Sequence, residues 1–394
     1  MEKKCSLTPH ADVELGFERK PIEYFVTSPD NGINDDTGLI LVIPGFGDRA
    51  DGEYQKDKLR PYLANKYNCL AVGVNYFGAQ LFALPGSETD YQLDVNAFQT
   101  AINDMFGVTP QEYTVNNSFD LSVLSGILAA RGIRKLGTEF RLFYRNRNDI
   151  NEYQSFGFLP AIDHLYVLRD VLKNYEVNRK KLIAFGTSYG GYISLLLGKF
   201  APKTFSVLID NSGFIKTMIE NIDTIHVLRK LDCLKLNGVE YPLVNHNPWT
   251  IIDDSSPYYF SDSHRCIRNL LANEHIGITL SRYYIFHSIE DTIVPIKEKD
   301  TFCAMLRERG IEVNYRPVNS NDIDGKLFKN LNHGMDASLR GIFDLVASSD
   351  NLSKKELLTD FDEESIYRFN CGEKTYIFSY DRNYNIKVDL TDTE

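Results

Sequence analysis

The sequence predicts an α/β fold, in which helices cover both faces of a doubly wound, mostly parallel sheet. Two observations lead to this prediction. Short continuous apolar runs, of the kind that a parallel sheet buries on both faces, alternate with stretches of helical apolar spacing. One run, Leu182 to Phe185, ends in the sharp turn Gly186-Thr-Ser-Tyr-Gly190, and an apolar helical stretch, Tyr192 to Phe200, follows at once. Strand, turn and helix in direct succession are the repeating unit of such a fold.

The individual elements follow from local patterns. Strands are expected where short runs rich in Val, Ile, Leu, Phe and Tyr end in Gly, Pro, Asn, Asp or Ser. Helices are expected where apolar residues recur every three or four positions. We expect one helix to be capped by Ser118 and stopped by Gly132, and another to begin at Pro160. In chain order the expected strands are 22–27, 39–43, 70–74, 182–185, 205–209, 282–287 and 312–317, and the expected helices are 53–67, 119–131, 160–175, 192–200, 298–309 and 336–348.

Two long segments interrupt this alternation. Residues 78–159 leave the core after the strand 70–74, and residues 214–280 leave it after the strand 205–209. Both therefore start at the carboxyl edge of the sheet, where ligands bind in open α/β sheets. We expect one core domain, 1–348, with these two insertions as a cap over its site. Residues 349–394 form a β-rich appendage, because 366–391 alternate like two or three strands, and packing or dimer contact is their expected role.

Composition excludes several classes of function. The net charge of −11 argues against nucleic acid and anionic membrane surfaces as partners. No apolar run reaches the ~18 residues of a membrane span, and no apolar segment follows Lys3-Lys4 as in a signal peptide, so a cytoplasmic location is expected. The six cysteines include no C-x-x-C, and the eight histidines include no H-E-x-x-H, so the sequence predicts neither metal nor cofactor.

The turn at Gly186–Gly190 carries the first sign of chemistry. A G-x-S-x-G pentapeptide alone is weak evidence, but between a buried strand and a helix it predicts a sharp elbow that exposes a serine hydroxyl. Ser188 would then sit at a helix N-terminus, where the helix dipole favours negative charge. The alternative interpretation is an ordinary glycine-rich βα turn.

Over residues 20–348 the chain resembles the α/β-hydrolase superfamily, in which an elbow serine, an acid and a histidine follow in this chain order. The resemblance implies Ser188 as nucleophile. It implies Asp291 as acid, from His287-Ser-Ile-Glu-Asp291-Thr-Ile-Val-Pro295, where Ser288 replaces a common glycine. It implies His333 as base, from Asn332-His333-Gly334. Within the superfamily, the chain is similar to a bacterial family whose genes accompany flagellin-glycosylation genes, which implies a glycan-related substrate.

The residues themselves agree with these roles. A serine hydroxyl needs an imidazole to take its proton, and the imidazole needs a carboxylate to fix its tautomer. Only His333 lies downstream of Asp291 among the histidines. Asp210 is a rival acid because it also ends a strand, and Glu290 is a second because it adjoins Asp291.

Two further groups complete the expected site. Backbone N–H groups of Tyr189 and Phe46 would form an oxyanion hole, the latter from the loop Pro44-Gly-Phe-Gly47, which resembles the superfamily's oxyanion loop. A phosphate-binding loop is the competing interpretation, but no G-K-[ST] follows. The aromatic residues Tyr76, Phe77 and Trp249 are candidates for substrate binding, with core packing as the alternative for each.

The expected function is that of a serine esterase on a small or sugar O-acyl ester, acting through an acyl-enzyme. Three alternatives stay open: a prolyl-oligopeptidase-like peptidase, an acyltransferase, and a catalytically silent binding module. The expected partner is the small-molecule or glycan ester alone, without nucleic acid or membrane, and a homo-oligomer is left open.

Overall fold

The structure, a computed structural model, describes most of the 394 residues. The described residues are 2–79, 89–92, 95–116, 118–137, 140, 142–146, 152–217, 233–245, 249, 251, 254–275 and 277–393. They form two compact units. The first comprises 1–80, 155–217 and 260–394, and the second comprises 81–154 and 218–259.

An eight-stranded sheet is the centre of the first unit, in the order β1-β2-β4-β3-β9-β10-β13-β14. The pairs β1–β2 and β2–β4 are antiparallel, and all the other pairs are parallel. This mostly parallel sheet is the α/β-hydrolase fold that the sequence predicted. The bounds are Glu2–Leu7 (β1), Ile22–Thr27 (β2), Gly38–Ile43 (β3), Cys69–Asn75 (β4), Leu182–Thr187 (β9), Val207–Asn211 (β10), Arg282–Ser288 (β13) and Val313–Val318 (β14).

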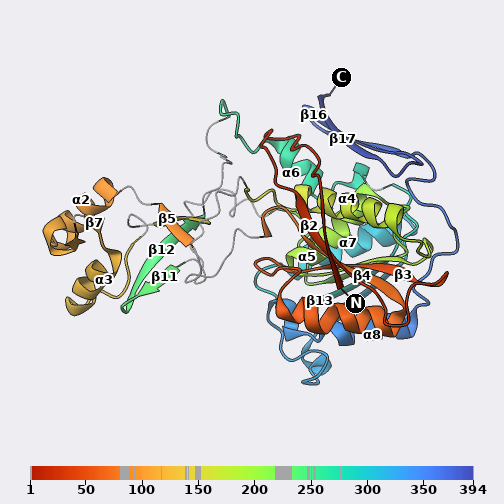
Figure 1. The fold of residues 1–394 in the computed structure, drawn as a ribbon, viewed down its shortest axis with the longest axis horizontal. Helices are drawn as coiled ribbons and strands as arrows, with labels where there is room; N and C mark the ends of the chain where they lie inside the picture. Colours follow the sequence, from red (N-terminus) through yellow and green to blue (C-terminus); the bar gives the residue numbers. More distant parts are fainter. Residues whose placement is uncertain are drawn as a thin grey trace. The chain divides into compact units, whose positions relative to one another are not determined.

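Helices pack against both faces of this sheet (Figure 1). On one face lie α1 (Arg60–Tyr67), which continues a π-helical segment Tyr54–Leu59, and α8 (Leu339–Ser349). Their buried residues join alternate residues of β3, β4 and β9 in one apolar cluster. Toward the other face lie α4 (Phe158–Asn174), α5 (Tyr189–Phe200) and α7 (Ile296–Glu308). Among the described residues, no helix combines the length and apolarity needed to cross a membrane.

Several helix ends differ from the sequence predictions, and helix α4 begins at Phe158 rather than at Pro160. Helix α3 (Leu121–Ala130) is capped by Asp120, whose side chain accepts hydrogen bonds from two backbone N–H groups, whereas Ser118 lies in the short strand β7 (Ser118–Phe119). Helix α8 begins at Leu339 rather than 336 because the chain is left-handed at Gly334 and Met335. Helix α5 begins directly after Ser188, three residues earlier than expected.

The second unit has its own sheet and core. Its four strands run in the order β11-β12-β8-β5, and aromatic and aliphatic side chains of α2, α3 and β12 form its buried cluster. The bounds are Thr89–Gln92 (β5), Val95–Phe106 (α2), Thr114–Val115 (β6), Leu142–Asn146 (β8), Cys233–Leu236 (β11) and Val239–Asn245 (β12). The expected insertions 78–159 and 214–280 extend further, since 155–159 and 260–280 belong to the first unit.

The last three strands form a separate antiparallel sheet, β15-β16-β17, that packs within the first unit. The ring of Phe378 stacks on Phe200 of α5 at a centroid distance of 4.5 Å. The hydroxyl of Tyr166, in α4, donates to the backbone oxygen of Ile386 at 2.8 Å. This sheet therefore covers α4 and α5. The strands are Ile366–Cys371 (β15), Lys374–Tyr380 (β16) and Ile386–Asp392 (β17), and helix α6 (Asp262–Arg268) lies beside β15.

Candidate active site

The turn between β9 and α5 holds Ser188 in a strained backbone conformation, with φ 54° and ψ −121°. A non-glycine residue at positive φ is uncommon and often marks a functional site. Close packing explains the flanking glycines. A Cβ atom on Gly186 would lie 2.0 Å from the backbone oxygen of Gly190, and one on Gly190 would lie 2.2 Å from that of Ile43. The elbow therefore tolerates no side chain at either position.

Three side chains that follow three different strands meet at this elbow. The Oγ atom of Ser188 lies 2.7 Å from Nε2 of His333, and Nδ1 of the same ring lies 2.7 Å from Oδ2 of Asp291. The Asp291 carboxylate accepts a hydrogen bond from the protonated Nδ1 atom of His333. The unprotonated Nε2 atom can therefore accept a hydrogen bond from the serine hydroxyl. The Asp291 side chain is fully buried, whereas 16% of the His333 side chain is exposed. The structure thus brings together the three residues that the sequence analysis singled out.

Asp291 is held as a carboxylate by several donors. Its Oδ1 atom accepts the backbone N–H groups of Ile293, at 2.8 Å, and Val294, at 2.9 Å. Burial raises the pKa of Asp291, but the hydrogen bonds from His333 and from these two N–H groups outweigh burial, so the pKa is lowered overall. The group is therefore negatively charged at neutral pH and fixed in orientation by contacts on both oxygens.

The histidine loop is positioned by a residue that the sequence analysis noted only as a departure. Ser288, which stands where glycine is common, donates its hydroxyl to the backbone oxygen of Leu331 at 2.6 Å. In the same loop, the Met335 N–H donates to the backbone oxygen of Asn332 at 2.8 Å and closes the turn that carries His333. A serine at this position thus ties the loop of the acid to the loop of the histidine.

The two rival acids have other partners. Asp210 is fully buried, forms an ion pair with Lys299, and accepts the Gly213 N–H at 2.7 Å. Glu290 is exposed. The geometry at the imidazole therefore favours Asp291 over both.

The loop after β3 lies against the elbow. A Cβ atom on Gly45 would be 3.6 Å from the Cβ of Ser188. The Tyr76 hydroxyl lies 3.3 Å from the backbone oxygens of Pro44 and Gly45, which tethers the loop to the end of β4. The rings of Phe46 and Tyr189 meet edge to face at 5.4 Å. The two residues expected to supply the oxyanion hole are thus neighbours beside Ser188.

The aromatic residues considered for substrate binding all have internal contacts. Tyr76 and Phe77 are 2% and 5% exposed, and Phe77 N–H donates to a carboxylate oxygen of Asp163 at 2.8 Å. Trp249, in the second unit, is 4% exposed, and its Nε1 donates to the backbone oxygen of Gln154 at 3.1 Å. These contacts describe packing, and a role in binding substrate stays a prediction.

One cluster among the described residues has the composition of a metal site. It consists of Cys266, His275 and Cys371, none of which belongs to the Ser188 site.

One family model and several solved structures are similar to this chain. A family model described as "Protein of unknown function (DUF2920)" matches residues 3–390. A search of the curated proteins finds no match. Solved structures with similarity include an acylaminoacyl peptidase of Pyrococcus horikoshii, at 13% identity and a TM-score of 0.47. They also include esterase 2 of Thermogutta terrifontis, at 10% and 0.45, and Est1E of Butyrivibrio proteoclasticus, bound to ferulic acid, at 12% and 0.42.

Coverage differs among these structures. The similarity to the peptidase extends over 90% of this chain but only 42% of the peptidase. The two esterases are covered over 97% and 94% of their length, by 90% and 84% of this chain. At such low identity, the names describe the neighbours, and no substrate follows from them for this chain.

Proposed function

The chain belongs to the DUF2920 family, and we propose that it is a serine hydrolase that cleaves carboxylic esters through an acyl-enzyme. The observation that carries the proposal is the continuous hydrogen-bonded series from Ser188 Oγ through His333 to Asp291, with both distances at 2.7 Å. Nucleophile and base within 2.6–3.2 Å, with the base oriented by a third group, are the signature of an activated serine.

The proposed mechanism assigns one proton path. The Ser188 hydroxyl attacks the ester carbonyl carbon while its proton moves to Nε2 of His333. The imidazolium then gives this proton to the departing alcohol, and the acyl group stays on Ser188. A water molecule then gives a proton to His333 and attacks the acyl carbon. His333 returns this proton to the Ser188 oxygen as the carboxylic acid leaves. Throughout, Asp291 stays ionised. The Nδ1 proton stays on His333 and donates a hydrogen bond to the carboxylate, which stabilises the positive charge on the ring.

The oxyanion that forms on the ester needs donors close to Ser188. We assign this role to the backbone N–H groups of Tyr189, at the start of α5, and Phe46, in the loop against which Ser188 packs. A helix N-terminus favours the developing negative charge. Loss of one such donor typically costs about 10²–10³ in kcat.

The proposed substrate is a small ester or an O-acyl group on a sugar. The sugar is favoured by the sequence resemblance to a family whose genes accompany flagellin-glycosylation genes. The small acyl group is part of this proposal, and a chain-length series of p-nitrophenyl esters tests it. Peptidase and acyltransferase activities would use the same three residues, and a panel of ester and anilide substrates separates the peptidase from the esterase.

The decisive experiment combines active-site labelling with a substrate panel. A fluorophosphonate probe should label the wild-type protein and a Ser320→Ala control, in which an exposed serine is removed, but not Ser188→Ala. Short p-nitrophenyl esters should be hydrolysed faster than long ones and faster than aminoacyl-p-nitroanilides. Faster anilide hydrolysis would indicate a peptidase, and equal labelling of Ser188→Ala would refute the proposed nucleophile.

A further inference from the structure

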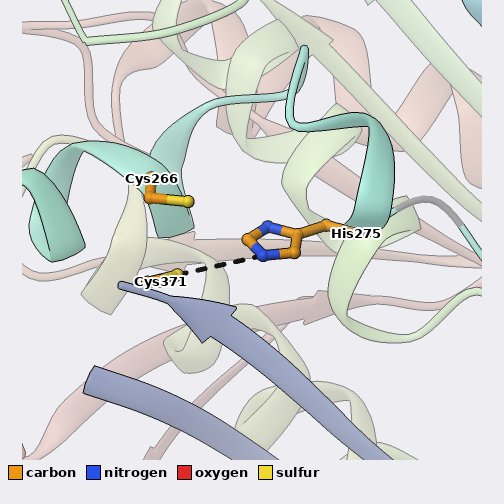
Figure 2. Close-up of side chains that lie close together, drawn as sticks. All are labelled: Cys266, His275 and Cys371. Atoms are coloured by element: carbon orange, nitrogen blue, oxygen red, sulfur yellow. Dashed lines mark hydrogen bonds between the residues drawn. The ribbon is translucent and has the colours of Figure 1, made fainter. Parts of the chain in front are cut away.

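Two thiols and an imidazole converge at the junction of the core with the C-terminal sheet. Cys266 comes from α6, His275 from a 3-10 turn over Asn273–His275, and Cys371 from the end of β15. Their ligand atoms all lie within 4.8 Å of one another. Figure 2 shows the Cys266 and Cys371 side chains on either side of the imidazole edge. From these contacts we propose that Cys266, His275 and Cys371 bind one Zn²⁺ ion.

The histidine is oriented as a metal ligand would be. Its Nε2 atom lies 2.9 Å from the backbone oxygen of Asn370, close enough to donate its proton there. With that proton on Nε2, the Nδ1 atom carries a lone pair. The residue as a whole is only 7% exposed, and its buried Nδ1 atom has no hydrogen-bond partner among the described residues. A zinc-bound histidine typically donates its other N–H to a backbone carbonyl or carboxylate in this way.

The spacing of the three ligand atoms suits a tetrahedral ion. With ligand bonds of about 2.0–2.3 Å, the ligand atoms around zinc lie about 3.8 Å apart or slightly less. The observed limit of 4.8 Å therefore requires side-chain movements of about an ångström at most. The fourth position is left to water, which can reach the cluster because Cys266 is only partly buried.

The donor set selects the metal. Two thiolates and one imidazole match the soft, borderline ligands that zinc prefers, whereas calcium and magnesium require oxygen ligands. Nothing in the sequence pattern signals this site, since its ligands are separated by 8 and 95 residues. Only the fold brings them together.

A bound ion would fasten β15 to the core. A hydrogen bond already joins α6 to β15 beside the cluster, from the Ser263 hydroxyl to the backbone oxygen of Cys371 at 2.6 Å. The ring of Phe369 meets His275 edge to face at 5.3 Å. Because the folded chain binds the metal and the unfolded chain largely does not, zinc should raise the unfolding temperature, and the stabilisation should grow with the logarithm of the ratio of free zinc concentration to Kd.

The experiment measures zinc binding to the full-length chain without an affinity tag. Metal is first removed with a chelator under reducing conditions, and Zn²⁺ is then titrated in competition with a chromophoric chelator. We expect one zinc ion per chain. Cys266→Ser should weaken binding at least about 100-fold, since even changes behind the ligands cost about 10–100-fold. The matched control is Cys5→Ser, which removes another partly buried thiol outside the cluster.

Cobalt binding provides a test that needs no variant. Co²⁺ in place of zinc should give the near-ultraviolet charge-transfer absorption of thiolate ligands, and Cys266→Ser should reduce it whereas Cys5→Ser should not. The proposal is overturned if the wild-type chain binds zinc no more tightly than Cys266→Ser, or if Co²⁺ gives no thiolate absorption. It is equally overturned if Cys266 and Cys371 form a disulfide that excludes the metal. Labelling of Ser188 is scored separately, so these outcomes do not depend on the hydrolase proposal.

Discussion

Replacing Asp291 by asparagine tests the proposed triad most sharply, because the structure dictates how the new amide must lie. One oxygen of Asp291 accepts two backbone N–H groups, from Ile293 and Val294, and the other faces Nδ1 of His333. The asparagine oxygen must keep the two N–H groups, since an NH₂ group there would oppose two donors. Its NH₂ group then faces Nδ1, which can accept only if the ring proton moves to Nε2. That tautomer cannot take the proton of Ser188.

The expected loss in kcat is about 10⁴-fold, the cost of the equivalent change in a serine protease. At 1.36 kcal/mol per tenfold, this corresponds to about 5 kcal/mol of transition-state stabilisation. The assay is hydrolysis of the best short p-nitrophenyl ester, with thermal unfolding measured on each variant. Glu290→Gln is the control and should retain nearly full activity, because Glu290 is exposed. Asp210→Asn should lower stability by leaving Lys299 buried without its partner, yet keep the activity of the folded fraction. The reasoning is refuted if Asp291→Asn retains activity within tenfold of wild type, or if Asp210→Asn alone is inactive while folded.

Three further changes probe the scaffold around the site. Ser288→Gly removes the hydrogen bond to the histidine loop and should lower the free energy of unfolding by about 1 kcal/mol, as measured by denaturant titration. The ester assay should show a several-fold drop in kcat. Unchanged kinetics would contradict the positioning role. Gly186→Ala places a methyl group 2.0 Å from a backbone oxygen and should abolish probe labelling, so full labelling would disprove the packing argument. Burial raises the pKa of Asp163, but Arg19 and His10 lower it to about 2, below the ordinary aspartate value of 3.8. The ionised carboxylate therefore contributes to folding stability above pH 3.8, and this contribution is lost as the pH falls toward 2. This contribution is roughly 2 kcal/mol and should disappear from the pH dependence of unfolding in Asp163→Asn.

The central sheet could be predicted because burial on both faces leaves a mark that is local in sequence. The strand expected at 22–27 is β2 as observed, and the other expected core strands agree with the structure within two residues at each end. The edge strand β1 was not predicted, because its sequence Glu-Lys-Lys-Cys-Ser-Leu contains no apolar run and none of its residues is fully buried. The helix after the elbow was placed too late, because Tyr189-Gly-Gly191 has no apolar helical spacing of its own.

Contacts between distant segments explain what the sequence could not supply. The sequence left Asp210 and Asp291 as competing acids, and their different environments depend on Lys299, which lies 89 residues from Asp210. Strands β8 and β12 pair across two segments of the second unit, and neither was predicted as a strand. The cluster of Cys266, His275 and Cys371 has the same origin. In each case the partner is chosen by the fold, and no spacing in the sequence records it.

The C-terminal sheet bears on the site through the helix that begins at the nucleophile. Fully buried Arg268 and Glu14 form an ion pair, and the Tyr376 hydroxyl of β16 donates to Glu14 at 2.8 Å. Burial raises the pKa of Glu14, but Arg268 lowers it overall, so the carboxylate stays charged. Tyr192 of α5 donates its hydroxyl to the backbone oxygen of Arg268. Breaking a buried pair costs about 3–5 kcal/mol, because one charge is left without its partner. The residues after 348 therefore supply contacts that hold the ion pair, and through Tyr192 the first turn of α5, in the position that Ser188 requires.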